Sequence, residues 1–471
     1  MTTIKLDPGA ALLLDALHGA GHAAYAVGGC VRDSLLGLDP HDWDLCTSAR
    51  PEQVMALFGE EKCIPTGLQH GTVTVKQGGR LYETTTFRTE GAYSDGRHPD
   101  AVCFVPDVRE DLARRDFTIN AMAYSAEEGL IDPFGGRDDL AAHLVRAVGE
   151  PERRFEEDAL RILRLYRFAA RFGFAIDPAT GAAARALGPH LDCVSAERIQ
   201  EELLKLLAAP RPGNYLEPAV LAVVLPELEP EKQPEQFAEL CRIIDRIEPT
   251  AENVPTRLAA LLCPLGEAGA RKALRKLKCS NALTDEVTAL EREAGGDAGS
   301  FSKDRPLGWD PVAAGNRAGD GMACNSNDRR QWRMQEVAVG TAASDTQAMR
   351  SGCWEPQPEL VSDQTLMAKR LLGRYELPTI QRLTALCSAR HPEQTGAFAA
   401  LRAEAERLTA ENACCRVSQL AVNGRDLMAA GVRPGPGLRQ VLNALLEAVI
   451  TGQTPNEKDA LLAAAAQFSA S

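Results

Sequence analysis

The pattern of hydrophobic residues changes once along the chain, close to the segment DPFGG at 132–136. Before it, from residue 24 to about 125, short runs rich in β-forming residues alternate with turns and short helical stretches. After it, nearly every segment has the periodicity of an amphipathic helix. At 471 residues the chain is also too long for one hydrophobic core. We therefore predict an α+β fold, in which a mixed α/β domain is followed by helical domains.

Individual elements follow from the same patterns. The strands of the first domain are short, and the helices after it carry one apolar face. We expect strands at 25–27, 43–46, 71–76, 80–88 and 102–105, and helices at 30–36, 51–57, 155–172, 196–207, 236–247, 255–262, 365–372, 438–450 and 457–468.

Charge and cysteine content restrict the class of protein. The net charge of −13 argues against a uniform binder of polyanions, because affinity for nucleic acid depends on lysine and arginine. Six arginines nevertheless crowd the segment 153–171, which is compatible with a local basic channel. The thirteen cysteines contain no Cys-x-x-Cys pair, and no export signal or membrane-spanning run precedes them. We expect reduced thiols in a cytoplasmic protein.

Two adjacent glycines, Gly28 and Gly29, follow the first expected strand and open a helix that carries Arg32. Glycine allows the backbone to approach an anion, a helix N-terminus offers free amides, and an arginine adds a charged fork for a phosphate. The same pattern also fits a tight turn beside a surface arginine.

Asp42 and Asp44 are one residue apart in the next expected strand. Alternate residues of a strand leave the same face, about 7 Å apart at the backbone. Two such carboxylates repel one another unless protons or cations intervene, and their hard oxygen atoms suit Mg²⁺. A pair of this kind fits a two-metal phosphoryl-transfer site, although Asp-x-Asp also occurs in solvated surface strands.

The segments VGGCVRDSLLG and HDWDLCTSARPEQV resemble the catalytic head of the class II tRNA nucleotidyltransferase and bacterial poly(A) polymerase family. The resemblance is dense over residues 20–210 and resumes weakly over 420–462. It continues, in the family's order, through TGLQHGTVTV, ETTTFRTEGAYSDGRHP, ARRDFTINAMAY, EEDALRILRLYRFAARF and ERIQEELLKLL.

The resemblance implies a fold and an activity. The fold would be a polymerase-beta-like nucleotidyltransferase head with a helical neck, body and tail. The activity would be template-independent addition of CCA to tRNA, which would be held by its acceptor arm and 3′ end. CTP and ATP would be the substrates, and two Mg²⁺ ions the cofactors. We place the catalytic head at 1–150, the neck with base recognition at 151–215, the body at 216–374 with an irregular insertion at about 295–359, and the tRNA-binding tail at 375–471.

The resemblance also implies roles for single residues. Asp42 and Asp44 would be catalytic and bind the metal ions, and Glu83 is the candidate for a third acidic group. Arg164 and Arg167 follow Arg161 at three-residue spacing and would serve the nucleotide or the primer. The nucleotide-binding residues would be Gly28, Gly29, Arg32, Asp33, Arg115, Asp116, Asn120, Asp158, Arg161, Arg164 and Arg167.

Asp158 and Arg161 form a pair that could read a nucleotide base. A carboxylate accepts a hydrogen bond from the amino group of cytosine or adenine, while a guanidinium donates to the adjacent ring nitrogen. Uracil and guanine present a carbonyl at the position of that amino group. One pair of side chains would thus admit CTP and ATP without a template. An ordinary helix salt bridge is the alternative reading.

Several related activities remain open. A polar loop at 93–99 favours complete CCA addition, but an enzyme adding only A or only CC, or a poly(A) polymerase, shares the same head. A non-catalytic tRNA-binding protein would lack one of the metal carboxylates, and both are present. The segment 257–267 lacks the His-Asp pair that related bacterial enzymes often carry there, so we expect no second hydrolase site. The oligomeric state cannot be predicted.

Overall fold

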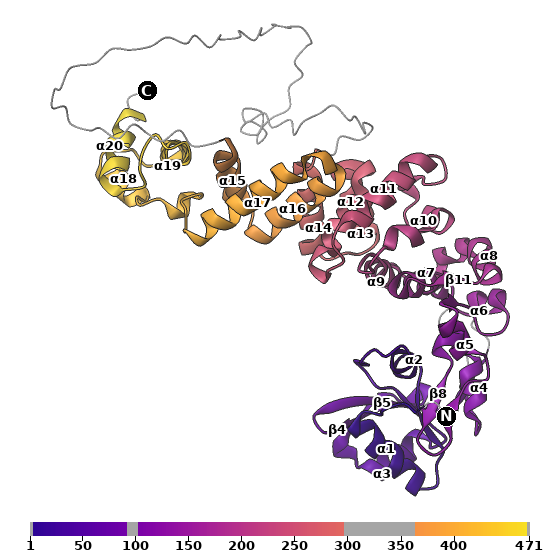
Figure 1. Ribbon diagram of the computed structural model, residues 1–471. Coiled ribbons are helices and arrows are strands. Elements are labelled where there is room, and N and C mark those ends of the chain that lie inside the picture. The colour runs from indigo at the N-terminus through magenta and orange to yellow at the C-terminus, as the bar shows by residue number, and fades with distance from the viewer. Residues whose placement is uncertain (1–2, 92–101, 296–362, 469–471) are drawn as a thin grey trace, which may run out of the picture. The chain divides into compact units, whose positions relative to one another are not determined.

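The computed structural model describes residues 3–91, 102–295 and 363–468 (Figure 1). The chain divides into two compact units, of which the first contains Met1–Ser300 and Pro378–Ala400 and the second Phe301–Leu377 and Leu401–Ser471. Nearly all of the expected insertion at 295–359 and the whole of the loop at 93–99 lie outside the described residues. Within the described ranges, no helix is long and apolar enough to cross a membrane, and every cysteine is a free thiol.

A seven-stranded mixed sheet forms the centre of the N-terminal domain, which confirms the predicted mixed α/β domain, although β3, β8 and β9 are not among the expected strands (Figure 1). Strand β1 pairs antiparallel with β2 on one side and with β8 on the other, whereas β2, the central strand, pairs parallel with β5. The order is β3 (Cys63–Gly67), β4 (Thr72–Gln77), β5 (Arg80–Thr86), β2 (Leu45–Thr47), β1 (Ala24–Val27), β8 (Ala123–Ser125) and β9 (Gly129–Ile131).

Two smaller strand pairs lie outside this sheet. The strand expected at 80–88 divides at Phe87, so that its last part becomes β6 (Arg88–Glu90), which pairs with β7 (Val102–Phe104). The parallel pair of β10 (Leu144–Val145) and β11 (Ala175–Ile176) joins the end of the N-terminal domain to the first helices after it.

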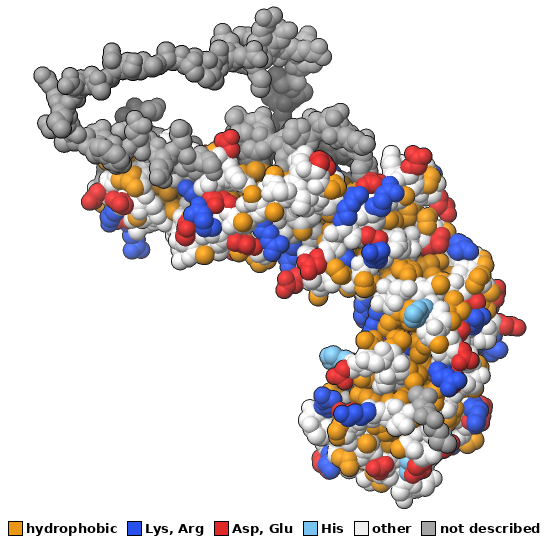
Figure 2. Space-filling model, viewed as in Figure 1, with side chains coloured by type: hydrophobic (Ala, Val, Ile, Leu, Met, Phe, Trp, Pro, Cys, Tyr) orange, Lys and Arg blue, Asp and Glu red, His pale blue; other side chains and the backbone are white. Residues whose placement is uncertain are grey.

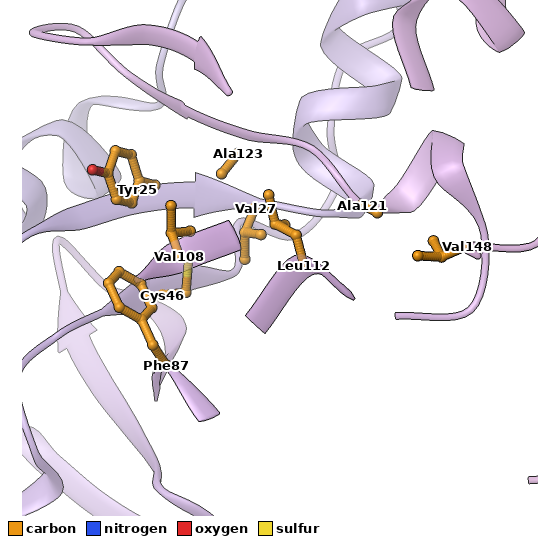
Figure 3. Packing of buried hydrophobic residues seen from close by; sticks show 9 residues of the cluster. All are labelled: Tyr25, Val27, Cys46, Phe87, Val108, Leu112, Ala121, Ala123 and Val148. Atoms are coloured by element: carbon orange, nitrogen blue, oxygen red, sulfur yellow. The ribbon is translucent and has the colours of Figure 1, made fainter. Parts of the chain in front are cut away.

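Buried side chains fill the space between one face of the sheet and helix α4 (Val108–Ala113) (Figure 3). Helices α1 (Pro8–Gly19) and α3 (Pro51–Phe58) also pack on the sheet. The helices expected at 30–36 and 51–57 are confirmed as α2 (Gly29–Leu35) and α3, whereas α1 is not among the expected helices. The cluster consists of Tyr25, Val27, Cys46, Phe87, Val108, Leu112, Ala121, Ala123 and Val148.

The rest of the first unit is helical, and the helices expected at 196–207, 236–247 and 255–262 are confirmed. Helix α7 packs along α9 and also contacts β10, at the end of the N-terminal domain. The helices are α5 (Gly136–Ala141), α6 (Pro151–Glu157), α7 (Leu160–Phe172), α8 (Pro178–Ala186), α9 (Ala196–Leu207), α10 (Pro218–Val224), α11 (Pro234–Arg246), α12 (Val254–Leu262), α13 (Gly266–Lys276), α14 (Asn281–Glu293) and, from Pro378 on, most of α16 (Leu377–Arg390).

The second unit is helical as well, and its expected helices at 365–372, 438–450 and 457–468 are confirmed. Its C-terminal part has a core of its own, built around Leu427, Leu445 and Leu461. The helices are α15 (Asp363–Arg374), the later part of α17 (Thr395–Ala410), α18 (Gly424–Ala429), α19 (Pro436–Ile450) and α20 (Lys458–Phe468).

The single helix predicted at 155–172 is wrong, because the chain breaks between α6 and α7. Asp158 has extended backbone angles, φ −147° and ψ 103°, and ends α6. Its carboxylate then accepts a hydrogen bond from the backbone N–H of Leu160 at 3.1 Å. An Asp side chain that accepts from the backbone N–H two residues on forms an Asx turn, which favours a new helix start over continuation.

Candidate active site

Asp44 lies where β1 and β2 separate. Its carbonyl accepts a hydrogen bond from the N–H of Val27, the last residue of β1, at 2.9 Å. Strand β2 begins only at Leu45, so the strand predicted at 43–46 starts too early. The reason is Gly28, whose φ of 78° turns the chain away and leaves Asp42 without a strand partner. The side chain of Asp42 is 86% exposed.

Glu83 extends the acidic group onto the neighbouring strand. The parallel register of β2 and β5 pairs Leu45 with Thr84, so the residues one position earlier, Asp44 and Glu83, lie side by side. Although Asp44 keeps an exposed surface, desolvation by the surrounding protein, then repulsion from Glu83 and Asp42, raises its pKa to about 6 against the effect of Arg115. Among the described residues, no set of three or more His, Cys, Asp or Glu side chains is arranged to hold a metal ion.

Arg115 lies against the glycine turn. A Cβ atom on Gly28 would be 2.9 Å from Nη1 of Arg115, so this position needs glycine both for its positive φ and for space. The N–H of Gly28 already donates to the carbonyl of Met122 at 3.0 Å. Arg115 donates to Asp111 at 3.3 Å, and its buried Nε has no hydrogen-bond partner among the described residues. A positive group with an unused donor therefore lies at the turn.

Arg32 is buried rather than open to a phosphate. It is only 4% exposed, and its guanidinium donates to Asp33 at 2.7 Å and to Asn120. It also lies over the rings of Phe168 and Phe172, at 5.3 and 4.9 Å from their centroids. Burial lowers the pKa of Arg32, although Asp33 favours the charged form. Arg32 thus connects α2 to α7 instead of presenting the free fork that its position after the glycines predicts.

Asp116 joins the same network from the other side. It accepts from Nδ2 of Asn120 at 3.1 Å, and from Nε and Nη2 of Arg164 at 2.9 and 2.6 Å. Burial would raise its pKa, but attraction to Arg164 and the hydrogen bond from Asn120 outweigh it and lower the pKa of Asp116 to about 2. Asp116 is therefore held as a carboxylate.

Asp158 and Arg161 do not pair with each other in this structure. Arg198, on α9, donates from Nη2 to Oδ2 of Asp158 at 2.8 Å. Arg161 donates to Oε2 of Glu157 at 2.8 Å and to the carbonyl of Arg114 at 3.1 Å. The two side chains expected to read the base thus each have another partner.

Sequence reasoning missed the acidic and basic partners that lie around these residues. Glu202, one turn after Arg198 on α9, pairs with Arg167 at 2.7 Å and lies 3.8 Å from Arg164. The guanidinium of Arg167 also lies 4.1 Å from the centroid of the Phe168 ring. The four-residue spacing of Glu157 and Arg161 is a recognisable helix signal. Contacts between α7 and α9 carry no such signal.

Comparison with known proteins finds relatives of this chain. The family model of the "Poly A polymerase head domain" matches residues 24–146, and that of "tRNA nucleotidyltransferase domain 2" matches 376–465. A CCA-adding enzyme from Limosilactobacillus fermentum is 34% identical over 97% of this chain and 96% of its own. One from Geobacillus stearothermophilus is 33% identical over 96% of this chain and 94% of its own.

A solved structure agrees along the whole length. The CCA-adding enzyme of Bacillus stearothermophilus, crystallised with CTP, has a TM-score of 0.71 and 30% sequence identity, and the match covers 98% of each chain. That of Thermotoga maritima, complexed with tRNA, has a TM-score of 0.60 at 19% identity and shares the fold. With identity above 30% over nearly the full length of both chains, this chain belongs to the CCA-adding enzyme family.

Proposed function

We propose that the protein adds C, C and A to the 3′ end of tRNA, taking the nucleotides from CTP and ATP without a template. Membership of the family supports this activity. The observation that carries it in this chain is the acidic group where β1 ends and β2 begins, in which desolvation and then the neighbouring carboxylates raise the pKa of Asp44. Like charges are gathered there beside the cationic Arg115 at a glycine turn, as a nucleotidyl-transfer site requires.

The acidic group has the donor chemistry for a divalent cation, although its described side chains are not gathered into a set of three ligands. Asp42 and Asp44 would hold two Mg²⁺ ions, with Glu83 as the third acidic side chain, because hard oxygen ligands of uncompensated charge suit this metal. When bound, the ions would lower the pKa of the tRNA 3′ hydroxyl and neutralise the triphosphate. Asp42 is exposed before β2 and contacts Nδ1 of His41 at 3.0 Å, a contact that it would exchange for a cation shared with Asp44.

The triphosphate would lie at the glycine turn. Gly28 and Gly29 keep this backbone free of side chains, and Arg115, whose Nη1 lies against the turn, would supply a guanidinium. Beneath them, Arg32, Asp33, Asp116 and Asn120 would hold the turn against α7. Arg164 and Arg167 would add positive charge on the nucleotide side, each balanced by an acidic partner.

Asp158 and Arg161 would select the base. The second lone pair of each Asp158 oxygen can accept from the amino group of cytosine or adenine. Arg161 would have to exchange a contact with Glu157 or Arg114 for the ring nitrogen. The exchange costs little if one charge-assisted hydrogen bond replaces another.

The protein would act in the cytoplasm. Its helices after residue 215 would bind the tRNA. On the face shown in Figure 2, Lys and Arg side chains lie among Asp and Glu. Contacts with tRNA phosphates would therefore come from small groups of basic residues and not from a continuous basic surface. On α13, Lys272, Arg275 and Lys276 are exposed, and no described acidic side chain pairs with them. Phosphates are the natural partners of such a group.

Product length on defined tRNAs tests the activity. The protein with Mg²⁺ and each NTP would be given transcripts that end before C, after C and after CC, and products would be resolved to one nucleotide. We expect the end to stop at CCA with CTP and ATP together. A long A tail would identify a poly(A) polymerase, whereas one added A, or CC alone, would identify a partial enzyme.

A further inference from the structure

Helix α9 presents charged side chains to the predicted base-reading residues. Arg198 and Glu202 are four residues apart and therefore lie on one face of the helix. Arg198 pairs with Asp158, while Glu202 pairs with Arg167 and lies near Arg164. Glu202 is buried, and Arg198 and Asp158 are largely so, with 22% and 16% of their side chains exposed. These pairs are less screened than surface ion pairs.

The carboxylate of Asp158 is held at both oxygens. Oδ1 accepts from the N–H of Leu160 at 3.1 Å, and Oδ2 accepts from Nη2 of Arg198 at 2.8 Å. The first contact fixes the carboxylate at the start of α7, and the second fixes its rotation about the side-chain bond. Each oxygen keeps one lone pair, so a carboxylate held this way still accepts but only from defined directions.

We propose that Arg198 is a positioning residue for nucleotide selection: it acts through Asp158 and does not touch the base. This inference rests on the proposed reading of the base by Asp158. Discrimination by a hydrogen bond requires an acceptor in a fixed direction, because a freely rotating carboxylate can turn away from the carbonyl of uracil. Without Arg198, Asp158 keeps its charge but loses its orientation.

The test compares kcat/KM for CTP and UTP on tRNA that ends before the first C. We expect Arg198→Ala to lower the CTP-over-UTP ratio by about threefold to tenfold, as is typical of one coupled pair, mainly through a higher KM for CTP. Arg198→Lys should restore part of the ratio, because it returns a donor to Asp158. Lys205→Ala is the matched control, since Lys205 is a half-exposed cation of α9 whose one acidic partner among the described residues is Glu201. It should leave the ratio unchanged.

The variant Asp158→Ala distinguishes failure of the proposed role of Arg198 from failure of base reading by Asp158. If Asp158→Ala lowers the ratio and Arg198→Ala does not, Arg198 has no positioning role and the proposed function stands. If Asp158→Ala leaves the CTP-over-UTP ratio unchanged, the base is read elsewhere, and neither Asp158 nor Arg198 has the proposed role in selection. In the double variant, the ratio should equal that of Asp158→Ala alone. A further drop, or a common loss for all four NTPs with a lower Tm, would show that Arg198 acts through the fold.

Discussion

The guanidinium of Arg164 donates two hydrogen bonds to the same oxygen of Asp116, from Nε at 2.9 Å and from Nη2 at 2.6 Å. Asp116 belongs to the N-terminal domain and Arg164 to α7, so this pair fastens the two together. Three further arginines do the same: Arg154 and Arg161 donate to backbone carbonyls of the N-terminal domain, and Arg171 donates to Asp33. The arginine-rich segment is therefore also structural.

Replacing Arg164 by Met should destabilise the protein. The buried carboxylate of Asp116 would lose its charged partner, which typically costs about 3 kcal/mol or more. Urea unfolding followed by circular dichroism measures the change. Arg153→Met is the control, because the side chain of Arg153 is 72% exposed. A variant of unchanged stability that no longer binds CTP would instead assign Arg164 to the nucleotide alone.

Replacing Asp42 or Asp44 by Ala should abolish addition of both C and A. Each change removes a carboxylate from the acidic group, whereas tRNA affinity depends on distant basic contacts and should survive. Asp39→Ala, at an exposed position shortly before the pair, should keep full activity. The measurements are single-turnover addition and tRNA binding by filter retention. More than a few per cent of activity in both variants would contradict the assignment.

Metal binding should weaken as the pH falls through about 6. The pKa of Asp44 is raised to about 6, so below this pH the carboxyl binds a proton that a cation must displace. Apparent affinity should fall by up to about tenfold per pH unit there. The readout is the Mg²⁺-induced rise in Tm between pH 5 and pH 7.5. Asp44→Asn should show no rise at either pH, and a rise independent of pH in the wild type would exclude Asp44 as a ligand.

The sequence predicts elements better than it predicts partners. The strand at 25–27 and the helix at 196–207 are confirmed. Both could be predicted because residue type and spacing within a short segment are enough to indicate them. The break before α7 is hidden, since the apolar stripe continues through it and the decisive contact is the turn that the carboxylate of Asp158 makes with the N–H of Leu160. The pairing of Asp158 with Arg198 joins residues 40 positions apart and depends on how α7 packs on α9.

The candidate site shows the same division. Asp44 and Glu83 can be chosen as acidic residues from the sequence, but their adjacency follows from the parallel pairing of β2 with β5. No local pattern fixes that pairing. Arg32 was predicted to face a phosphate because it follows the glycines, but it turns toward Phe168 and Phe172 of α7. Local chemistry identifies charged residues, and tertiary packing decides which of them pair.

Stability of the helical part should fall as the pH rises toward 8. Glu291 of α14 is fully buried, and burial raises its pKa to about 8, although Arg390 favours the ionised form. A carboxyl whose pKa is raised on folding stabilises the fold at low pH, and this contribution is lost between about 4.5 and 8. Glu291→Gln should remove the dependence, on the order of a few kcal/mol.

Hydrogen exchange of the α14 amides at pH 5, 6.5 and 8 measures this local stability, after correction for the intrinsic rate. Glu235→Gln, at an exposed position of α11, is the control and should keep the wild-type dependence. If Glu291→Gln and the wild type change in parallel, Glu291 is not the titrating group.

The basic group on α13 should bind the tRNA backbone. Lys272, Arg275 and Lys276 have the spacing that places them on one face, and all three are exposed. Their replacement by Ala should weaken tRNA binding, with little change in the KM for CTP. Each lost phosphate contact should also reduce the slope of log K against log salt by up to about 0.9, so the salt titration counts contacts. Replacing Lys205, Lys232 and Arg242, which have acidic partners, removes the same charge elsewhere. If both triple variants lowered the slope equally, only net charge would matter, and α13 would have no specific role.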